Sequence, residues 1–221
     1  MRASLVASAL LVSAGPAAAE APSGAPAGGG PGAGSERAAA DLSHKGQLEG
    51  SVRLGLGMRA IATYDNMDYC GDTDPQGQFG FASVCTGRAP FSLDLELGYG
   101  VARRVDLFAE LRVGLESDFG ASPTTGGPRM LHLSPGARFF FSEGSRSKLF
   151  TTAQIVFDFA GYEDAGGAGR GTDFGIRNLS GLWFDLARAY GVYVYVGETA
   201  TFARWMRFEL EGGIGVQGRY R

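Results

Sequence analysis

The sequence of 221 residues is poor in charge and has no long apolar run. Charged residues make up 19% of it, against about 25% in typical soluble domains. Glycine (36 residues) and phenylalanine (15 residues) are abundant. No stretch approaches the roughly 20 continuous apolar residues that a transmembrane helix needs. Any crossing of a membrane must therefore be made by strands. The formal net charge of −3 gives no basic surface, so we expect no nucleic-acid partner.

The N-terminus has the pattern of a secretory signal peptide. Arg2 precedes an apolar run at residues 5–12, and the small-residue site Ala17-Ala18-Ala19 follows. This arrangement predicts a signal peptide at residues 1–19 and export of the rest. No cysteine follows the cleavage site, so a lipid anchor is not expected. Residues 20–45, rich in alanine, glycine and proline, are predicted to form a flexible tail.

Cysteine is scarce as well, since the chain contains only Cys70 and Cys85. Their spacing is not C-x-x-C, which argues against thiol redox chemistry. In an exported protein we expect them to form a disulfide that staples a surface loop, with two free thiols as the alternative. The bridge would contribute about 3 kcal/mol in the chain-entropy model.

From residue 47 onward, apolar and polar residues alternate, which is typical of strands with one apolar face. In the first segment Leu54 and Leu56 fall on one face, and Arg53 falls on the other. Eight such segments are predicted, at residues 48–64, 91–101, 105–115, 131–141, 149–159, 174–186, 190–196 and 206–220. The sixth is the weakest, because Asn178 and Ser180 interrupt its apolar face, which leaves room for a β-bulge.

The connections between these segments alternate in length. The longer ones cover residues 65–89, 118–129, 160–172 and 199–204, and the short ones cover 102–104, 142–147 and 187–189. An even number of strands with this alternation is typical of Gram-negative outer-membrane barrels, with short turns in the periplasm and long loops outside. We therefore predict an all-β fold, an eight-stranded antiparallel up-and-down transmembrane β-barrel over residues 46–221, with both termini in the periplasm.

Alternation alone does not distinguish a membrane barrel from a soluble, lipocalin-like exported barrel. The aromatic residues of the apolar face do. They gather near the loop ends (Tyr64, Phe91, Phe157, Phe159, Phe174 and Phe208) and near the turn ends (Tyr99, Phe139, Phe141, Phe184, Tyr190 and Tyr220), with aliphatic residues between them. Two aromatic girdles around an aliphatic band indicate a bilayer. The soluble barrel stays the alternative.

The region from residue 46 to 221 resembles the small outer-membrane β-barrel family, of the OmpA transmembrane-domain and OmpX kind. The resemblance rests on the strand pattern, on the hairpin at residues 97–108, and on a C-terminal strand with Gly215 and Tyr220. It departs in ending on Arg221, where the family usually has an aromatic residue. It implies contact with outer-membrane lipid and with the barrel-assembly machinery. It therefore implies a fold and a location in the outer membrane more than an activity.

The polar face carries both signs of charge at close spacing. An eight-stranded barrel is just wide enough for side chains to fill it, so we predict an ion-pair network in the lumen and, as the alternative, a narrow channel. The predicted members are Glu49, Arg53, Arg59, Asp94, Glu96, Glu110, Arg112, Arg138, Asp158, Arg207, Glu209 and Glu211.

One motif offers an enzymatic alternative. His132 and Ser134 share a face, and the motif resembles the His-x-Ser of outer-membrane lipid A deacylases, which implies His132 as base and Ser134 as nucleophile. Both should point into the lumen, away from lipid, and no orienting acid is found at the expected spacing. His44 lies in the tail, where we expect no partner and no metal site. We therefore predict a non-enzymatic protein without cofactor or metal, with a structural or surface-interaction role and an extracellular partner on the loop at residues 65–89.

Overall fold

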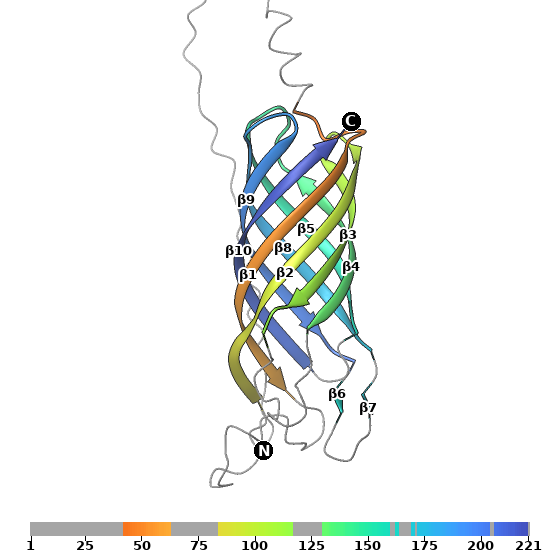
Figure 1. Cartoon of the computed structure of the whole chain (residues 1–221), viewed down its shortest axis with the longest axis vertical. Coiled ribbons are helices and arrows are strands. Elements are labelled where there is room, and N and C mark those ends of the chain that lie inside the picture. The colour runs from red at the N-terminus through yellow and green to blue at the C-terminus, as the bar shows by residue number, and fades with distance from the viewer. Residues whose placement is uncertain are drawn as a thin grey trace, which may run out of the picture. The chain divides into compact units, whose positions relative to one another are not determined.

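The computed structural model describes residues 42–62, 84–116, 130–159, 162–163, 169–170, 172–203 and 206–220. Its body is a closed barrel of eight strands, all antiparallel to their neighbours (Figure 1). Around the barrel the strands are β1 (Leu48–Ala62), β10 (Met206–Tyr220), β9 (Tyr190–Thr201), β8 (Asp173–Asp185), β5 (Ser147–Asp158), β4 (Leu131–Phe140), β3 (Val105–Gly114) and β2 (Val84–Ala102). β6 (Tyr162–Glu163) and β7 (Gly169–Arg170) form a separate two-stranded ribbon. The predicted eight-stranded fold is confirmed.

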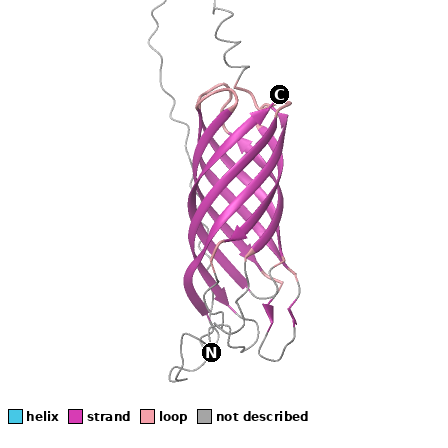
Figure 2. Ribbon diagram, viewed as in Figure 1, coloured by secondary structure: helices cyan, strands magenta, loops and turns pink. Residues whose placement is uncertain are grey.

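Figure 2 shows strands and their connections throughout the described residues. No helix among these residues is long and apolar enough to cross a membrane.

The two ends of the barrel carry different connections. At one end, which we call the turn end, short turns join β2 to β3, β4 to β5 and β8 to β9, and β1 begins and β10 ends there (Figure 1). The remaining connections leave from the opposite end, which we call the loop end.

Each strand presents one face to an outer wall and the other to the interior. In β1, Leu54 and Leu56 are exposed on the outer wall, whereas the adjacent Arg53 points to the interior and is fully buried. Apolar residues make up most of the outer wall, and its aromatic side chains lie toward the two ends: Phe157, Phe174 and Phe208 near the loop end, and Phe141, Tyr190 and Tyr220 near the turn end. The barrel is therefore polar inside and apolar outside.

β2 is longer than the alternation predicts, because it begins at Val84 and not at Phe91. Its register against β1 shifts between Gly55 and Gly57, where Pro90 and Phe91 together stand opposite one residue of β1. This is a β-bulge, a site that tolerates a proline because the ladder is already interrupted there. Outward residues have even numbers before the bulge and odd numbers after it. Because the parity changes at the bulge, the alternation of apolar and polar residues did not predict the first half of β2.

The bulge that the sixth segment left room for is absent from β8. Its register against β9 is unbroken from Gly175, opposite Thr201, to Asp185, opposite Gly191. The polar residues that interrupt its apolar face are accommodated by hydrogen bonds instead, as in the bond that the Asn178 amide donates to the Thr151 hydroxyl, 3.1 Å long.

Aromatic rings fill the interior near the turn end. Trp183 stacks on Tyr193, with ring centroids 4.6 Å apart, and meets Phe140 and Phe150 edge-on. Gly191 makes room for this packing, since a Cβ there would lie 2.8 Å from the indole nitrogen of Trp183. Trp183 is therefore a core residue of the barrel interior.

Candidate functional site

The interior of the barrel holds the charged side chains and is the candidate functional site. The structure buries all twelve residues predicted for it: Glu49, Arg53, Arg59, Asp94, Glu96, Glu110, Arg112, Arg138, Asp158, Arg207, Glu209 and Glu211. They come from β1 to β5 and from β10. Because alternate residues of a strand point to the same side, closure of the sheet brings them into one narrow space.

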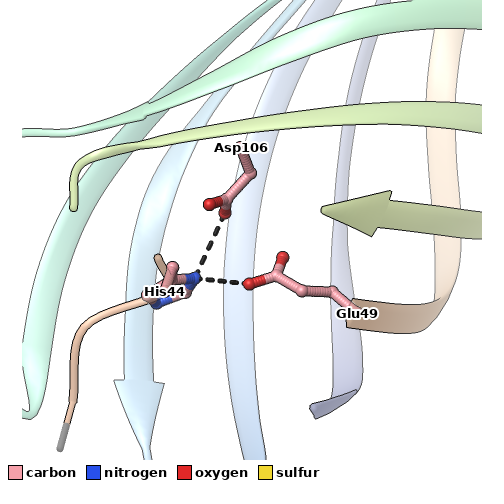
Figure 3. Close-up of side chains that lie close together, drawn as sticks. All are labelled: His44, Glu49 and Asp106. Atoms are coloured by element: carbon pink, nitrogen blue, oxygen red, sulfur yellow. Dashed lines mark hydrogen bonds and ion pairs between the residues drawn. The ribbon is translucent and has the colours of Figure 1, made fainter. Parts of the chain in front are cut away.

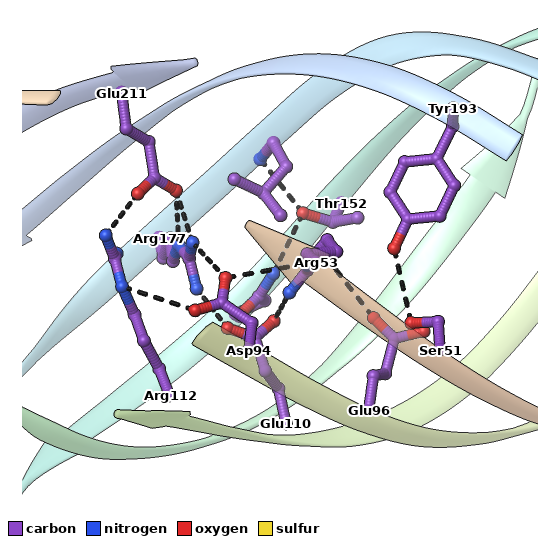
Figure 4. A network of polar contacts seen from close by, with 12 residues as sticks. Ser51, Arg53, Asp94, Glu96, Glu110, Arg112, Thr152, Arg177, Tyr193 and Glu211 are labelled. Carbon is purple, nitrogen blue, oxygen red and sulfur yellow. Dashed lines mark hydrogen bonds and ion pairs between the residues drawn. The ribbon is translucent and has the colours of Figure 1, made fainter. Parts of the chain in front are cut away.

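Three arginines and four carboxylates meet at mid-height and form what we call the central network: Arg53, Arg112, Arg177, Asp94, Glu96, Glu110 and Glu211 (Figure 4). Nε of Arg53 lies 3.5 Å from a carboxylate oxygen of Asp94, and Nη1 lies 3.4 Å from one of Glu96. Arg177 donates to Asp94 at 3.0 Å and also contacts Glu110 and Glu211. Each guanidinium thus bridges several strands.

Arg177 is the member that the sequence pattern missed. It lies on β8, whose apolar face is interrupted, so its position did not read as one of a regular polar series. Its odd number gives it the same parity as the buried Asp173 and Asp185, which is the signal that could have found it. Asp106 on β3 and Lys148 on β5 are further buried charges outside the predicted set.

A second group of ion pairs lies toward the loop end. Arg59 donates to Glu209 at 2.6 Å, and Arg207 donates to Asp158 at 2.9 Å. Nη2 of Arg207 also lies 3.1 Å from Nε2 of His132.

His132 and Ser134 both face the interior and are fully buried. They do not form a hydrogen-bonded pair: neither the Ser134 hydroxyl nor Nδ1 of His132 has a hydrogen-bond partner in the described part of the chain. The other ring nitrogen of His132 is engaged by Arg207. Without a base in contact with the hydroxyl, this geometry offers no activated nucleophile.

The expectation that His44 lies in a tail without a partner is wrong. Its imidazole is buried inside the turn end, where Nδ1 lies 2.7 Å from Oε1 of Glu49 and 3.1 Å from Oδ2 of Asp106 (Figure 3). The ring packs on Phe140, with centroids 4.3 Å apart. The chain reaches this position through a turn at Gly46, whose φ of 75° suits glycine. Residues 42–47 therefore cap the turn end and are not part of a free tail.

The electrostatic surroundings of His44 favour its protonated form. Burial alone would lower its pKa, but the hydrogen bonds to Asp106 and Glu49 outweigh burial and raise the pKa above the ordinary value. These three residues also offer one nitrogen and two oxygen atoms within 4.8 Å of one another, as a metal ion requires. However, Arg138 lies 3.7 Å from Glu49 and Arg219 lies 3.4 Å from His44. With two guanidinium groups already present, a single proton fits the charge of this cluster better than a divalent ion does.

Several predictions lie outside the described residues. They are the signal peptide, the tail up to residue 41, Cys70 and the side chain of Cys85, and most of the loop at residues 65–89. The disulfide thus stays a prediction.

No protein-family model and no curated protein matches the chain. Among solved structures, the chain is similar to Neisserial surface protein A, with a TM-score of 0.52 and 13% identity over 80% of this chain and 100% of that one. It is also similar to the N-terminal β-barrel domain of OprF from Pseudomonas aeruginosa, with a TM-score of 0.51 and 12% identity over 80% and 98% of the two chains. The chain therefore has the fold of small eight-stranded outer-membrane barrels, as the sequence pattern predicted. At this identity no residue's role carries over.

Proposed function

We propose that this protein is an integral outer-membrane barrel of a Gram-negative bacterium that has a structural or surface-contact role and no enzymatic activity. One observation carries the proposal: an apolar outer wall surrounds an interior closed by ion pairs. An apolar wall of this extent is unfavourable in water and is what a lipid-embedded barrel requires. The similarity of the fold to small outer-membrane barrels is in keeping with it.

The filled interior supports a scaffold more than a channel. Arg53, Arg112 and Arg177 are at most 2% exposed and lie across the barrel at mid-height. A solute could pass only if several buried ion pairs separated, which costs several kcal/mol for each charge left unpaired.

We expect the short turns, the start of β1 and the end of β10 to face the periplasm, and the long connections to face the outside. Outer-membrane lipid covers the wall, and the assembly machinery inserts the barrel. The connection between β1 and β2, which carries Cys70 of the predicted disulfide, would present the surface for an extracellular partner.

The first test is heat-modifiability of the mature chain folded in detergent. A folded band that forms only with detergent or lipid, and that changes mobility on boiling, supports the membrane location. A chain that folds as a monomer in detergent-free buffer contradicts it and favours the soluble alternative.

A pair of substitutions on the outer wall sharpens this test. Leu95, midway along the wall of β2 between Phe91 and Tyr99, is 43% exposed. In a bilayer Leu95→Arg should lower the free energy of unfolding by about 2–4 kcal/mol, whereas Tyr220→Arg at the turn end should cost at most about 1 kcal/mol. In a soluble barrel both exposed sites would tolerate arginine to within about 0.5 kcal/mol.

A further inference from the structure

A single polar cluster interrupts the apolar outer wall. Its members, which we call the outer polar cluster, are Thr151 on β5, Asn178 and Ser180 on β8, and Glu198 on β9. Asn178 is the register partner of Glu198, and Ser180 is that of Thr151, so the four lie together on three adjacent strands (Figure 1). Between the aromatic residues of the two ends, the other outward positions of the described strands carry apolar residues or glycine.

Three members of the cluster bind one another. The Asn178 amide donates to the Thr151 hydroxyl at 3.1 Å, the hydroxyls of Thr151 and Ser180 lie 2.9 Å apart, and Ser180 donates to the Asn178 carbonyl oxygen at 3.2 Å. Glu198 is exposed, and its carboxylate makes no hydrogen bond or ion pair with any described residue. The cluster therefore presents an unpaired acceptor beside hydroxyl groups that can rotate.

The height of the cluster excludes lipid headgroups as its partners. On β8, Asn178 lies four residues from Phe174, and Ser180 lies four residues from Phe184. Four residues span about 13 Å of strand, so the cluster is at the middle of the apolar band, where only acyl chains reach. Acyl chains offer no hydrogen bond, and a carboxyl group facing them is unfavourable.

The wall is hollowed beside the cluster. A groove of about 610 Å³ is lined by residues of β4, β5, β8, β9 and β10. Ile155, Ile176 and Phe208 form its apolar sides. Ala153 and Ala200, which also line it, have small side chains. Small residues at such a surface let the backbones of two membrane segments approach closely, and polar side chains then join them.

We propose that this face, centred on the outer polar cluster and the groove, is the interface through which two copies of the chain associate in the membrane. The inference rests on the proposed membrane location. A second copy is favoured as the occupant because the face is self-complementary. The Glu198 carboxylate is an acceptor, and the Ser180 hydroxyl, which donates to the side-chain oxygen of Asn178, can rotate and donate to Glu198 of a second copy. Two copies inserted in the same direction meet with equivalent residues at equal depth, as a two-fold axis along the membrane normal requires.

The test is sedimentation equilibrium of the folded mature chain in density-matched detergent, with boiled and unboiled gel mobility as a separate measure of folding. The wild-type chain is expected to be a dimer in equilibrium with monomer. Glu198→Leu and Ser180→Ala should each weaken association about tenfold. Ala153→Trp, which fills the groove, should give a monomer.

Leu95→Trp is the control, because Leu95 is exposed on the outer wall of β2, which lies opposite β8 in the strand order. It should dimerise like the wild type. A wild-type chain that folds in detergent but stays monomeric at every concentration overturns the dimer and leaves the membrane location intact. Ala153→Trp associating as tightly as Leu95→Trp overturns this face as the interface. A chain that folds without detergent removes the basis of both proposals.

Discussion

The two halves of the barrel interior are filled by different means. Toward the turn end, aromatic rings such as Trp183 and Tyr193 pack tightly, and His44 enters from outside the sheet to cap them. Toward the loop end, the inward side chains include Ser134, Thr199 and Thr201, whose hydroxyls find no hydrogen-bond partner among the described residues. The same fold thus supports an aromatic, capped half and a half with small hydroxyl side chains, with the central network between them.

The largest effect is expected at the boundary between the halves. Arg177→Met should lower the free energy of unfolding by about 3–5 kcal/mol, because it leaves Glu110 and Glu211 buried with too little positive charge. Urea unfolding in lipid vesicles, followed by tryptophan fluorescence, measures this. The double variant Arg177→Met/Glu110→Gln should recover part of the loss. A loss below about 1 kcal/mol for the single variant would contradict a structural role for the network.

An intermediate, pH-dependent effect is expected at the capped end. The contacts with Asp106 and Glu49 raise the pKa of His44 above its value of 6.5 in the unfolded chain. The stabilisation from this group is therefore complete below about pH 6.5 and is lost as the pH rises through the higher pKa of the folded state. His44→Gln should remove the part of the pH dependence of unfolding that begins near pH 6.5 and continues to higher pH. An identical pH profile for variant and wild type would show that the cap does not depend on the proton.

The smallest effect is expected at the loop end. Thr199→Val replaces a buried hydroxyl without a described protein partner by a methyl group of similar shape. Since no protein hydrogen bond is lost, the free energy of unfolding should change by no more than about 0.5 kcal/mol. The loss of unfolding free energy, measured in urea, is compared with that of Ser51→Ala at the turn end. That variant removes the hydrogen-bond partner of the Tyr193 hydroxyl. A larger loss for Thr199→Val than for Ser51→Ala would reverse the comparison.

The sequence predicts the fold because apolar and polar residues alternate along each strand of a barrel, with a period of two residues. Arg53, Asp94 and Glu110 could be assigned to the interior by parity alone, since one step along a strand reverses the direction of the side chain. The same rule fails where the parity changes. Pro90 and Phe91 form a bulge, and the part of β2 that precedes them no longer matches the pattern.

Other parts of the site depend on contacts that no local pattern records. His44 does not belong to an alternating segment. Its burial follows from the turn at Gly46 and from its contact with Asp106, which lies 62 residues later in the sequence. Arg177 shows the opposite failure. Its parity was correct, but the outward neighbours Asn178 and Ser180 weakened the strand signal around it, for a reason that concerns the outer wall and not the interior.

The seam between the first and last strands has a consequence for how the chain folds. β1 and β10 pair along fifteen residues, from Leu48 with Tyr220 to Ala62 with Met206. Contacts of such long range form late, because the loop they close is almost the whole chain. Until then both strands are open edges with unpaired N–H and C=O groups, which hydrocarbon does not tolerate. Completion of the C-terminal strand is therefore the step that commits the chain to its final state, and shortening β10 should trap an open, aggregation-prone sheet.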